Sequence, residues 1–209
     1  MGILSYLPVV LIGYLLGSSN MAYYLAAIRG VDLRAGGSGN PGASNALILM
    51  GWPAGVLVGA HDIGKAVLAV WLARHFFPQL AFCGVVAGVA CVLGHIFPFY
   101  LRFRGGKGFA AYLGMALALE WRVALIIMAV VVLVTLITDY IVVGTVTTVV
   151  SFPIYWAFTH SLIAVAVLCV ASGIILWKHR ANLVRIAKGT EIGFRSANRG
   201  DHRRREKQE

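Results

Sequence analysis

The chain has 209 residues, of which 59% are hydrophobic and 12% are charged. Soluble domains carry about twice that share of charged residues, so the composition excludes a soluble globular enzyme, a disordered tail and a secreted disulfide scaffold. The net charge is +10, and 10 of the 18 Lys and Arg residues lie in 178–209, a distribution typical of the cytoplasmic flank of a membrane helix rather than of a nucleic-acid-binding face.

The remaining class is an all-α membrane protein, and we expect a polytopic bundle of about seven transmembrane helices. About 20 apolar residues cross a bilayer. The first stretch has no Lys or Arg before it, so we expect a retained span rather than a signal peptide. The fourth stretch is short, and a five-span bundle is the alternative. In chain order the apolar stretches are 3–28, 52–73, 79–100, 108–119, 122–138, 141–158 and 160–177.

The distribution of basic residues predicts an N-terminus outside and a C-terminus in the cytoplasm. With seven spans, the segments on the side of the C-terminus carry 15 Lys and Arg residues, and the opposite segments carry only Arg74. Basic loops stay in the cytoplasm. We therefore expect a multi-pass protein of the cell membrane with one domain over 1–191. Residues 192–209 then form a basic, disordered cytoplasmic tail that is attracted to anionic lipids.

A glycine-rich loop, Gly-Gly-Ser-Gly-Asn-Pro-Gly-Ala-Ser-Asn over 36–45, follows the first stretch on the inner side. Glycine permits positive φ angles, and several N–H groups of such a loop can point at one anion. A helix that follows the loop adds the positive end of its dipole. The alternative is a flexible surface linker. The residues expected to contact an anion here are Gly37, Ser38, Gly39, Asn40 and Asn45.

A second inner loop, Arg-Phe-Arg-Gly-Gly-Lys-Gly over 102–108, precedes the short fourth stretch. Cations at a helix N-terminus are unfavourable unless an anion is shared, which indicates a phosphate site with Lys107 as its point charge. It is not a nucleotide P-loop, because Gly108 stands where Ser or Thr would hold magnesium. A simple positive anchor is the alternative, and it suits Arg102. The expected ligands are Arg104, Gly105, Gly106, Lys107 and Gly108.

Polar residues inside or beside apolar stretches complete the candidate site. Asp62 and Lys65 share a helix face and should pair, either as a structural ion pair or to orient a ligand-binding cation. His95 ends the third stretch, where it either binds a phosphate or hydroxyl or is a capped interfacial histidine. His179 and Asn182 are three residues apart beyond the last stretch, and a basic flank does not explain Asn182.

Several catalytic signatures are absent from the sequence. No His is followed five positions later by Asp, there is no Gly-x-Ser-x-Gly elbow, and no cluster has metal-ligand spacing. We therefore expect no metal, no cofactor and no protein nucleophile.

Taken in order, these motifs resemble the bacterial membrane acyl-phosphate-dependent glycerol-3-phosphate acyltransferase family. The resemblance implies a seven-helix bundle that transfers a fatty acyl group from acyl phosphate to the 1-hydroxyl of glycerol 3-phosphate, giving lysophosphatidate and phosphate. It also implies catalytic roles for Ser38, His179 and Asn182 and a cytoplasmic site. The matching segments are Val31–Arg34, Gly37–Asn45, Asp62 with Lys65, Gly94–Pro98, Phe103–Gly108, His179–Asn182 and Gly189–Glu191.

The chain departs from the family pattern at three positions. Ile48 stands where the pattern has Arg, Ala181 where it has Glu, and Val142 where a looser alignment has Ser. Lys does not replace the planar guanidinium of Arg equivalently. The candidates to supply it are Arg34, Arg104 and Arg180. An impaired paralogue is therefore one alternative hypothesis. The other is a small transporter or binding protein for an organic phosphate, which the charges of Asp62 and Lys65 inside a span would suit.

The parts suggest a mechanism that depends mainly on positioning. Acyl phosphate is already activated, so the attacking hydroxyl needs orientation and a proton acceptor. The hypothesis is that a phosphate oxygen of the donor takes the proton, with His179 as the competing base. The expected partners are the two substrates, membrane lipids and, in transient contact, the soluble enzyme that makes acyl phosphate. No nucleic acid is expected.

Overall fold

The structure is a computed structural model that describes residues 2–195, and in this range it contains helices and turns but no strand. The helices agree with the predicted all-α class. In chain order they are η1 (Ile3–Tyr6), α1 (Leu7–Ser18), α2 (Met21–Arg29), α3 (Ala43–Met50), α4 (Trp52–Phe76), α5 (Cys83–Ile96), η2 (Phe99–Leu101), α6 (Phe109–Leu119), α7 (Trp121–Thr138), α8 (Ile141–Thr159) and α9 (Leu162–Ala187).

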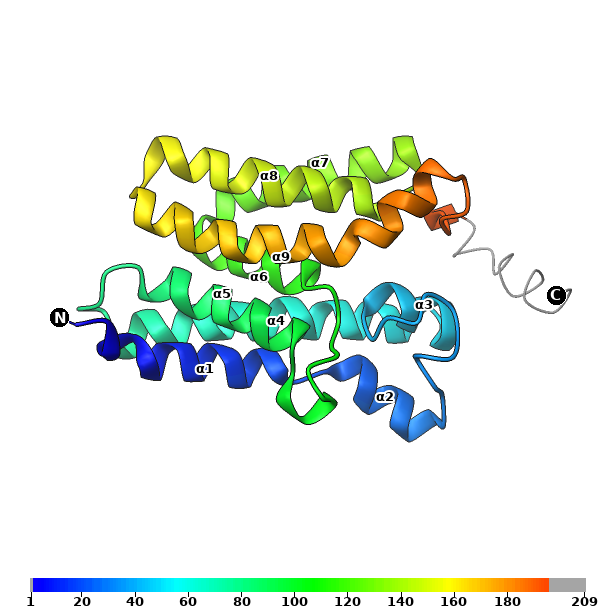
Figure 1. Ribbon diagram of the computed structural model, residues 1–209, viewed down its shortest axis with the longest axis horizontal. Helices are drawn as coiled ribbons and strands as arrows, with labels where there is room; N and C mark the ends of the chain where they lie inside the picture. Colours follow the sequence, from blue (N-terminus) through cyan, green and yellow to red (C-terminus); the bar gives the residue numbers. More distant parts are fainter. Residues whose placement is uncertain (1, 196–209) are drawn as a thin grey trace, which may run out of the picture.

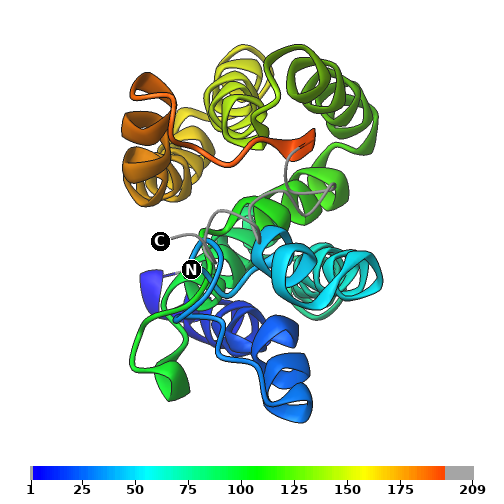
Figure 2. The ribbon, with the colours of Figure 1, turned by 90° about the vertical axis from the view of Figure 1, so that its right-hand side faces the viewer.

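The long helices run side by side along one axis and form two groups (Figures 1 and 2). In one group α1 packs along α5, and α4 packs on both α5 and α6. In the other group α8 contacts α7 and α9. Short α6 lies between the groups and joins them, since it contacts α4, α5 and α7, while α5 also meets α9. The two glycine-rich loops and the end of α9 lie in the half of the bundle opposite the start of α1 (Figure 1).

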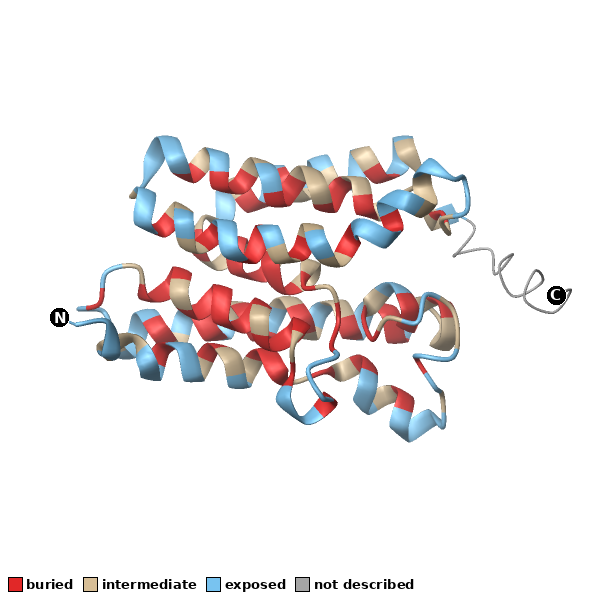
Figure 3. Cartoon of the chain, viewed as in Figure 1, coloured by how far each residue is buried: buried red, intermediate tan, exposed pale blue. Residues whose placement is uncertain are grey.

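Six helical segments of the described chain are long and apolar enough to cross a membrane. Large apolar side chains, including Ile126, Ile137 and Phe158, are exposed on the outward surfaces of these helices, as suits a face in contact with lipid (Figure 3). α6 has 11 residues, which at 1.5 Å per residue cover roughly half of a 30 Å hydrocarbon core. The expected bundle is thus supported for six spans. The seventh span and the orientation of the termini stay predictions.

Two helix ends differ from the boundaries that hydropathy predicts. The stretch expected over 3–28 is divided into α1 and α2, because the Asn20 side chain accepts a hydrogen bond from the Tyr23 amide and starts a new helix. The stretch expected to end at residue 177 continues to Ala187. Lys, Arg and Ala are good helix formers, so the helix does not stop where the apolar run stops. This extension places His179 and Asn182 on one helix.

The C-terminal segment joins the bundle further along than we expected. Residues 192–195 were assigned to a disordered tail, but the Phe194 amide donates to the Asp139 carbonyl oxygen at 2.7 Å. The Arg195 amide also donates to Asp139 Oδ1 at 2.8 Å. These bonds hold the segment against the turn between α7 and α8, and the domain boundary at 191/192 stays a prediction. The rest of the predicted tail, 196–209, lies outside the described residues.

Candidate active site

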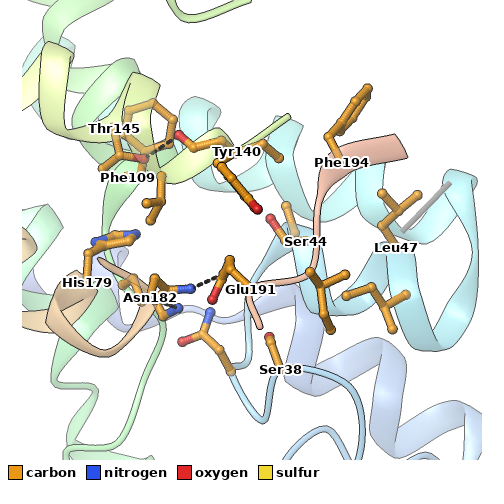
Figure 4. Close-up of a pocket in the computed structure, with 18 of the residues that line it drawn as sticks. Ser38, Ser44, Leu47, Phe109, Tyr140, Thr145, His179, Asn182, Glu191 and Phe194 are labelled. Atoms are coloured by element: carbon orange, nitrogen blue, oxygen red, sulfur yellow. Dashed lines mark hydrogen bonds between the residues drawn. The ribbon is translucent and has the colours of Figure 1, made fainter. Parts of the chain in front are cut away.

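A cavity of about 360 Å³ lies where both glycine-rich loops meet α3, the start of α8 and the end of α9 (Figure 4). Its lining contains both polar and apolar side chains, which suits a ligand with a charged head and a hydrocarbon tail. The polar lining includes Ser38, Asn40, Ser44, Lys107, His179, Asn182, Arg185 and Glu191. The apolar lining includes Leu47, Ile48, Phe109, Ile141, Val142, Ile192 and Phe194.

Lys107 is the central cation of the polar part. It lies two residues before α6, as predicted, and its Nζ donates to Asn182 Oδ1 at 2.5 Å. The pKa of Lys107 is lowered from 10.5 to about 8, mainly by burial; the negative charge of Glu191 opposes the fall, and the positive charge of Arg185 adds to it. The nearest partner is a neutral amide, so the ammonium charge is not cancelled by direct contact with a carboxylate.

The end of α9 presents three polar side chains to the cavity at a repeated spacing of three residues. They are His179, Asn182 and Arg185. The Asn182 Nδ2 donates to Glu191 Oε1 at 2.5 Å, and the Arg185 Nε donates to Glu191 Oε2 at 2.6 Å. Glu191 therefore links both α9 side chains, and through Asn182 it reaches Lys107 (Figure 4).

His179 is buried and is oriented by its own helix. Its Nδ1 lies 2.8 Å from the Ile175 carbonyl oxygen, which can only accept, so Nδ1 carries the proton and donates. In the neutral ring Nε2 then has a lone pair. Since His179 lines the cavity, this ring can accept a proton from a bound hydroxyl.

The first glycine-rich loop is shaped by Asn45. This side chain is fully buried, its Oδ1 accepts from the Ser38 amide at 2.8 Å, and its Nδ2 donates to the Leu33 carbonyl oxygen at 2.8 Å. Gly37 has a φ of 59°, and a Cβ there would collide with Asn45 Oδ1. Asn45 and Gly39 were expected to contact ligand, but neither lines the cavity. Both residues instead form hydrogen bonds within the loop region, and these bonds position Ser38 at the cavity.

The second loop is fixed to the end of α5. The Gly105 amide donates to the Ile96 carbonyl oxygen at 3.0 Å, and the Gly106 amide donates to the His95 carbonyl oxygen at 3.1 Å. The N–H groups of Gly105 and Gly106 are therefore already bonded to α5, and the contact of these two glycines with an anion stays a prediction. Gly108 has a φ of 91° and precedes α6, and the lining of the cavity includes Gly108, Phe109 and Ala110 at the start of this helix.

Arg34 and Arg104 do not reach this cavity, although we expected both to bind substrate. Arg34 Nη2 donates to the Arg104 carbonyl oxygen at 3.3 Å, and both side chains are exposed. Arg34 lines a separate cavity of about 650 Å³ beside α2. Arg180 is also turned away, because its Nη1 donates to the Trp177 carbonyl oxygen. Ile48 stands where the family pattern has an arginine, and none of the three arginines proposed to replace it lines the cavity.

A buried charged cluster borders the cavity below the second loop. Lys65 Nζ lies 2.8 Å from Asp62 Oδ1, which confirms the predicted pair. The same ammonium donates to the Ser19 carbonyl oxygen at 2.7 Å and lies 2.9 Å from His95 Nδ1. Asp62 and His95 line the cavity, whereas Lys65 does not. Lys65 was expected to bind substrate, but its contacts give it a role in joining helices.

The sequence reasoning missed two functional candidates, Arg185 and Glu191. Glu191 belonged to a matched motif without a role, and Arg185 was counted only as part of the basic flank. The available signal was the three-residue spacing that Arg185 shares with His179 and Asn182, since that spacing puts all three on one helix face.

Comparison with known proteins identifies the family. The family model described as glycerol-3-phosphate acyltransferase matches residues 7–189. This chain belongs to the glycerol-3-phosphate acyltransferase family. A glycerol-3-phosphate acyltransferase of Clostridioides difficile (strain 630) is 36% identical over 197 residues, covering 91% of this chain and 96% of the relative. One of Coxiella burnetii (strain CbuG_Q212) is 40% identical over 189 residues, covering 87% and 94%.

Two solved structures of this acyltransferase family have the same fold. The crystal structure of PlsY (YgiH), an integral membrane glycerol 3-phosphate acyltransferase, in its glycerol 3-phosphate form matches with a TM-score of 0.85 and 33% identity, covering 91% of this chain and 96% of that one. The lysophosphatidic acid form matches with a TM-score of 0.82 and 31% identity, covering 92% and 98%. The chain is therefore an integral membrane acyltransferase with several apolar helices.

Proposed function

We propose that the protein transfers a fatty acyl group from acyl phosphate to the 1-hydroxyl of glycerol 3-phosphate. The observation that carries this proposal is the cavity lined by both glycine-rich loops, which combines Lys107, His179 and Asn182 with apolar side chains. Membership of the acyltransferase family and the glycerol 3-phosphate and lysophosphatidic acid forms of the related crystal structures support it. The product is lysophosphatidate, and inorganic phosphate leaves.

The polar part of the cavity binds the phosphate groups. Lys107 supplies a point charge, and the first-turn amides of α6 supply N–H donors at the positive end of the helix dipole. Ser38 and Asn40 offer further hydrogen bonds from the facing loop. The acyl chain contacts apolar side chains of the lining, such as Leu47 or Phe109. Both substrates are then held next to each other.

The chemical step needs one bond made, one bond broken and one proton moved. The 1-hydroxyl oxygen of glycerol 3-phosphate attacks the acyl carbonyl carbon, and the bond from that carbon to the phosphate oxygen breaks. Lys107 and the α6 amides stabilise the charge on the departing phosphate. A phosphate oxygen of the donor takes the hydroxyl proton, with His179 Nε2 as the competing base. Holding both substrates in line contributes most of the rate enhancement.

Replacing His179 by Gln tests which base acts. If the donor phosphate accepts the proton, His179→Gln keeps a substantial kcat and changes mainly the KM for glycerol 3-phosphate. A variant that folds and binds glycerol 3-phosphate normally but loses nearly all of its kcat contradicts substrate-assisted proton transfer.

The site faces the cytoplasm in this proposal. The cavity lies in the half of the bundle that carries the basic loops and the end of α9 (Figure 1), and basic segments stay inside. A soluble cytoplasmic enzyme can then deliver acyl phosphate, and membrane lipids surround the site. The single catalytic domain includes the segment up to Arg195, whose contacts close one side of the cavity.

The deciding experiment compares acyl donors with the purified protein in detergent micelles. We expect palmitoyl phosphate and labelled glycerol 3-phosphate to give lysophosphatidate and phosphate in equal amounts. Palmitoyl-CoA in place of palmitoyl phosphate should give no product. Product from palmitoyl-CoA alone would overturn the donor assignment. Detergent also removes any sealed compartment, so turnover there excludes transport of an organic phosphate as the explanation.

A further inference from the structure

We infer that Arg185, held in place by Glu191, supplies the guanidinium that binds the phosphate of glycerol 3-phosphate. It does so in place of the arginine that the family pattern has at position 48. This inference rests on the proposed function and adds a residue to it.

Position 48 cannot provide the cation in this chain. Ile48 is 4% exposed and forms part of the apolar lining of the cavity. Arg34, Arg104 and Arg180 do not line the cavity. Among the described residues that do, Arg185 is the one arginine.

The guanidinium of Arg185 is oriented yet still able to bind. Its Nε donates to Glu191 Oε2 at 2.6 Å, which fixes one edge of the plane. Within the part of the chain that the structure describes, the two Nη atoms make no hydrogen bond, and the side chain is 40% exposed. Two parallel N–H donors on a planar group match the spacing of two phosphate oxygens. This edge of Arg185 can therefore take a phosphate while Glu191 keeps the other edge.

Glu191 also sets the charge of the empty site. It accepts from both Asn182 and Arg185, and Asn182 accepts from Lys107. Arg185 contacts this carboxylate directly, and Lys107 reaches it only through Asn182. Asp62, the other carboxylate in the lining, is paired with Lys65, so the two cations Lys107 and Arg185 lie beside one remaining carboxylate. The net positive charge favours a dianion such as a phosphate monoester, and the hydrogen bonds arrange both cations before the substrate arrives.

The direct test measures steady-state kinetics of Arg185→Gln and Arg185→Lys with palmitoyl phosphate. For Arg185→Gln we expect the KM for glycerol 3-phosphate to rise about 10- to 100-fold, the effect of losing a hydrogen bond to a charged group. The KM for palmitoyl phosphate should stay within a few-fold. Arg185→Lys keeps the charge but loses the planar pair of donors. Its KM for glycerol 3-phosphate should therefore lie between the values of the wild type and of Arg185→Gln.

A rescue variant separates phosphate binding from a purely structural role. Ile48→Arg in the Arg185→Gln background should recover most of the lost affinity for glycerol 3-phosphate, because the guanidinium returns to the cavity at the position of the family pattern. If Arg185 only holds Glu191, this second substitution recovers nothing. An unchanged KM in Arg185→Gln, or a failed rescue, overturns the inference.

Arg180→Gln is the matched control. Arg180 lies on the same helix, loses the same charge on substitution and is exposed outside the cavity, so its KM should equal that of the wild type. Failure of the proposed function is seen separately, because the wild-type protein would then form no lysophosphatidate from palmitoyl phosphate. Failure of the inference leaves wild-type turnover intact and removes only the dependence on Arg185.

Discussion

Lys107 is a largely buried cation whose nearest hydrogen-bond partner is the neutral amide of Asn182. Its charge is costly in this setting, which is why burial lowers its pKa to about 8. A phosphate that enters the cavity would offset that cost. The same feature that makes Lys107 unfavourable in the empty site therefore makes it an effective anion ligand.

This pKa predicts a pH dependence of substrate affinity. Below pH 8 the free site carries the Lys107 charge, and above pH 8 it progressively loses it. The phosphate group has its second pKa near 6, so the substrate is a dianion throughout. The KM for the phosphate substrate that contacts Lys107 should therefore be flat from pH 7 to 8 and then rise by up to about tenfold per pH unit.

Lys107→Arg is the control for this pH profile. Arginine stays charged over the whole range, so the rise in KM above pH 8 should disappear even if the absolute KM changes. Steady-state kinetics between pH 7 and 10 provide both profiles. A wild-type profile that stays flat to pH 10 would mean that the Lys107 charge does not contribute to binding.

At the scale of elements, the Asp62–Lys65 pair of α4 connects this helix to α5 and to the break between α1 and α2. Lys65 on α4 donates to the Ser19 carbonyl oxygen at the break between α1 and α2, and it also lies beside His95 of α5. The break leaves the Ser19 carbonyl oxygen exposed to the bundle interior, and the ammonium satisfies it. Asp62 neutralises the buried ammonium.

Removing only one member of this pair should destabilise the bundle strongly. Asp62→Leu leaves the Lys65 ammonium buried without its carboxylate, and the expected loss in the free energy of unfolding is about 3–5 kcal/mol. The double variant Asp62→Leu with Lys65→Met replaces both charges by apolar groups and should recover a large part of the loss. Thermal unfolding in detergent measures both. A double variant less stable than the single one would contradict this account.

Close contact between α1 and α5 depends on glycine. A Cβ on Gly17 would collide with the Cys91 carbonyl oxygen, and a Cβ on Gly13 would collide with the Ala87 carbonyl oxygen. Small residues let membrane helices approach until their backbones touch, which is where their packing energy arises. The same spacing positions α5, and with it His95 in the lining of the cavity.

Gly17→Ala should therefore push α1 away from α5 and cost about 1–3 kcal/mol, as overpacking does in other cores. Gly64→Ala is the matched control, because a Cβ at Gly64 in α4 meets nothing within 4 Å. It should leave the melting temperature unchanged or raise it slightly. Equal melting temperatures for the two variants would show that the α1–α5 approach is not tight.

The features that could be predicted from the sequence are those that depend on residues close together in the chain. The helix after Lys107 and the Asp62–Lys65 pair follow from local spacing, and both are present. Arg185 and Glu191 were missed because the chain after α9 folds back over the cavity, and no local pattern shows that return.

Misassigned residues fail for a related reason. Arg34 and Arg104 belong to motifs beside the site, but motif order does not tell which way a loop side chain points. The direction of the Gly105 and Gly106 amides depends on two preceding residues, Arg102 and Phe103, which have φ values of 54° and 59°. Non-glycine residues seldom adopt such angles, so sequence alone does not predict that these amides turn toward α5.

At the scale of the whole molecule, charge and site lie in the same half. The start of α1 lies at one end of the bundle, while the glycine-rich loops and the end of α9 lie toward the other (Figure 1). Ser38 and Lys107, from loops far apart in sequence, line one cavity. They must therefore face the same side of the membrane. The basic residues nearby predict that this side is the cytoplasm.

Labelling single cysteines in intact cells tests that orientation. Cys83, Cys91 and Cys169 are free thiols in the described chain and are first replaced by alanine. A cysteine is then placed at Ser161, in the turn between α8 and α9, or at Lys188, just after α9. We expect a membrane-impermeant maleimide to label Ser161→Cys in intact cells and Lys188→Cys only after the cells are opened. The reverse pattern would place the cavity outside the cell, where no cytoplasmic acyl phosphate can reach it, and the proposed reaction would lose its donor.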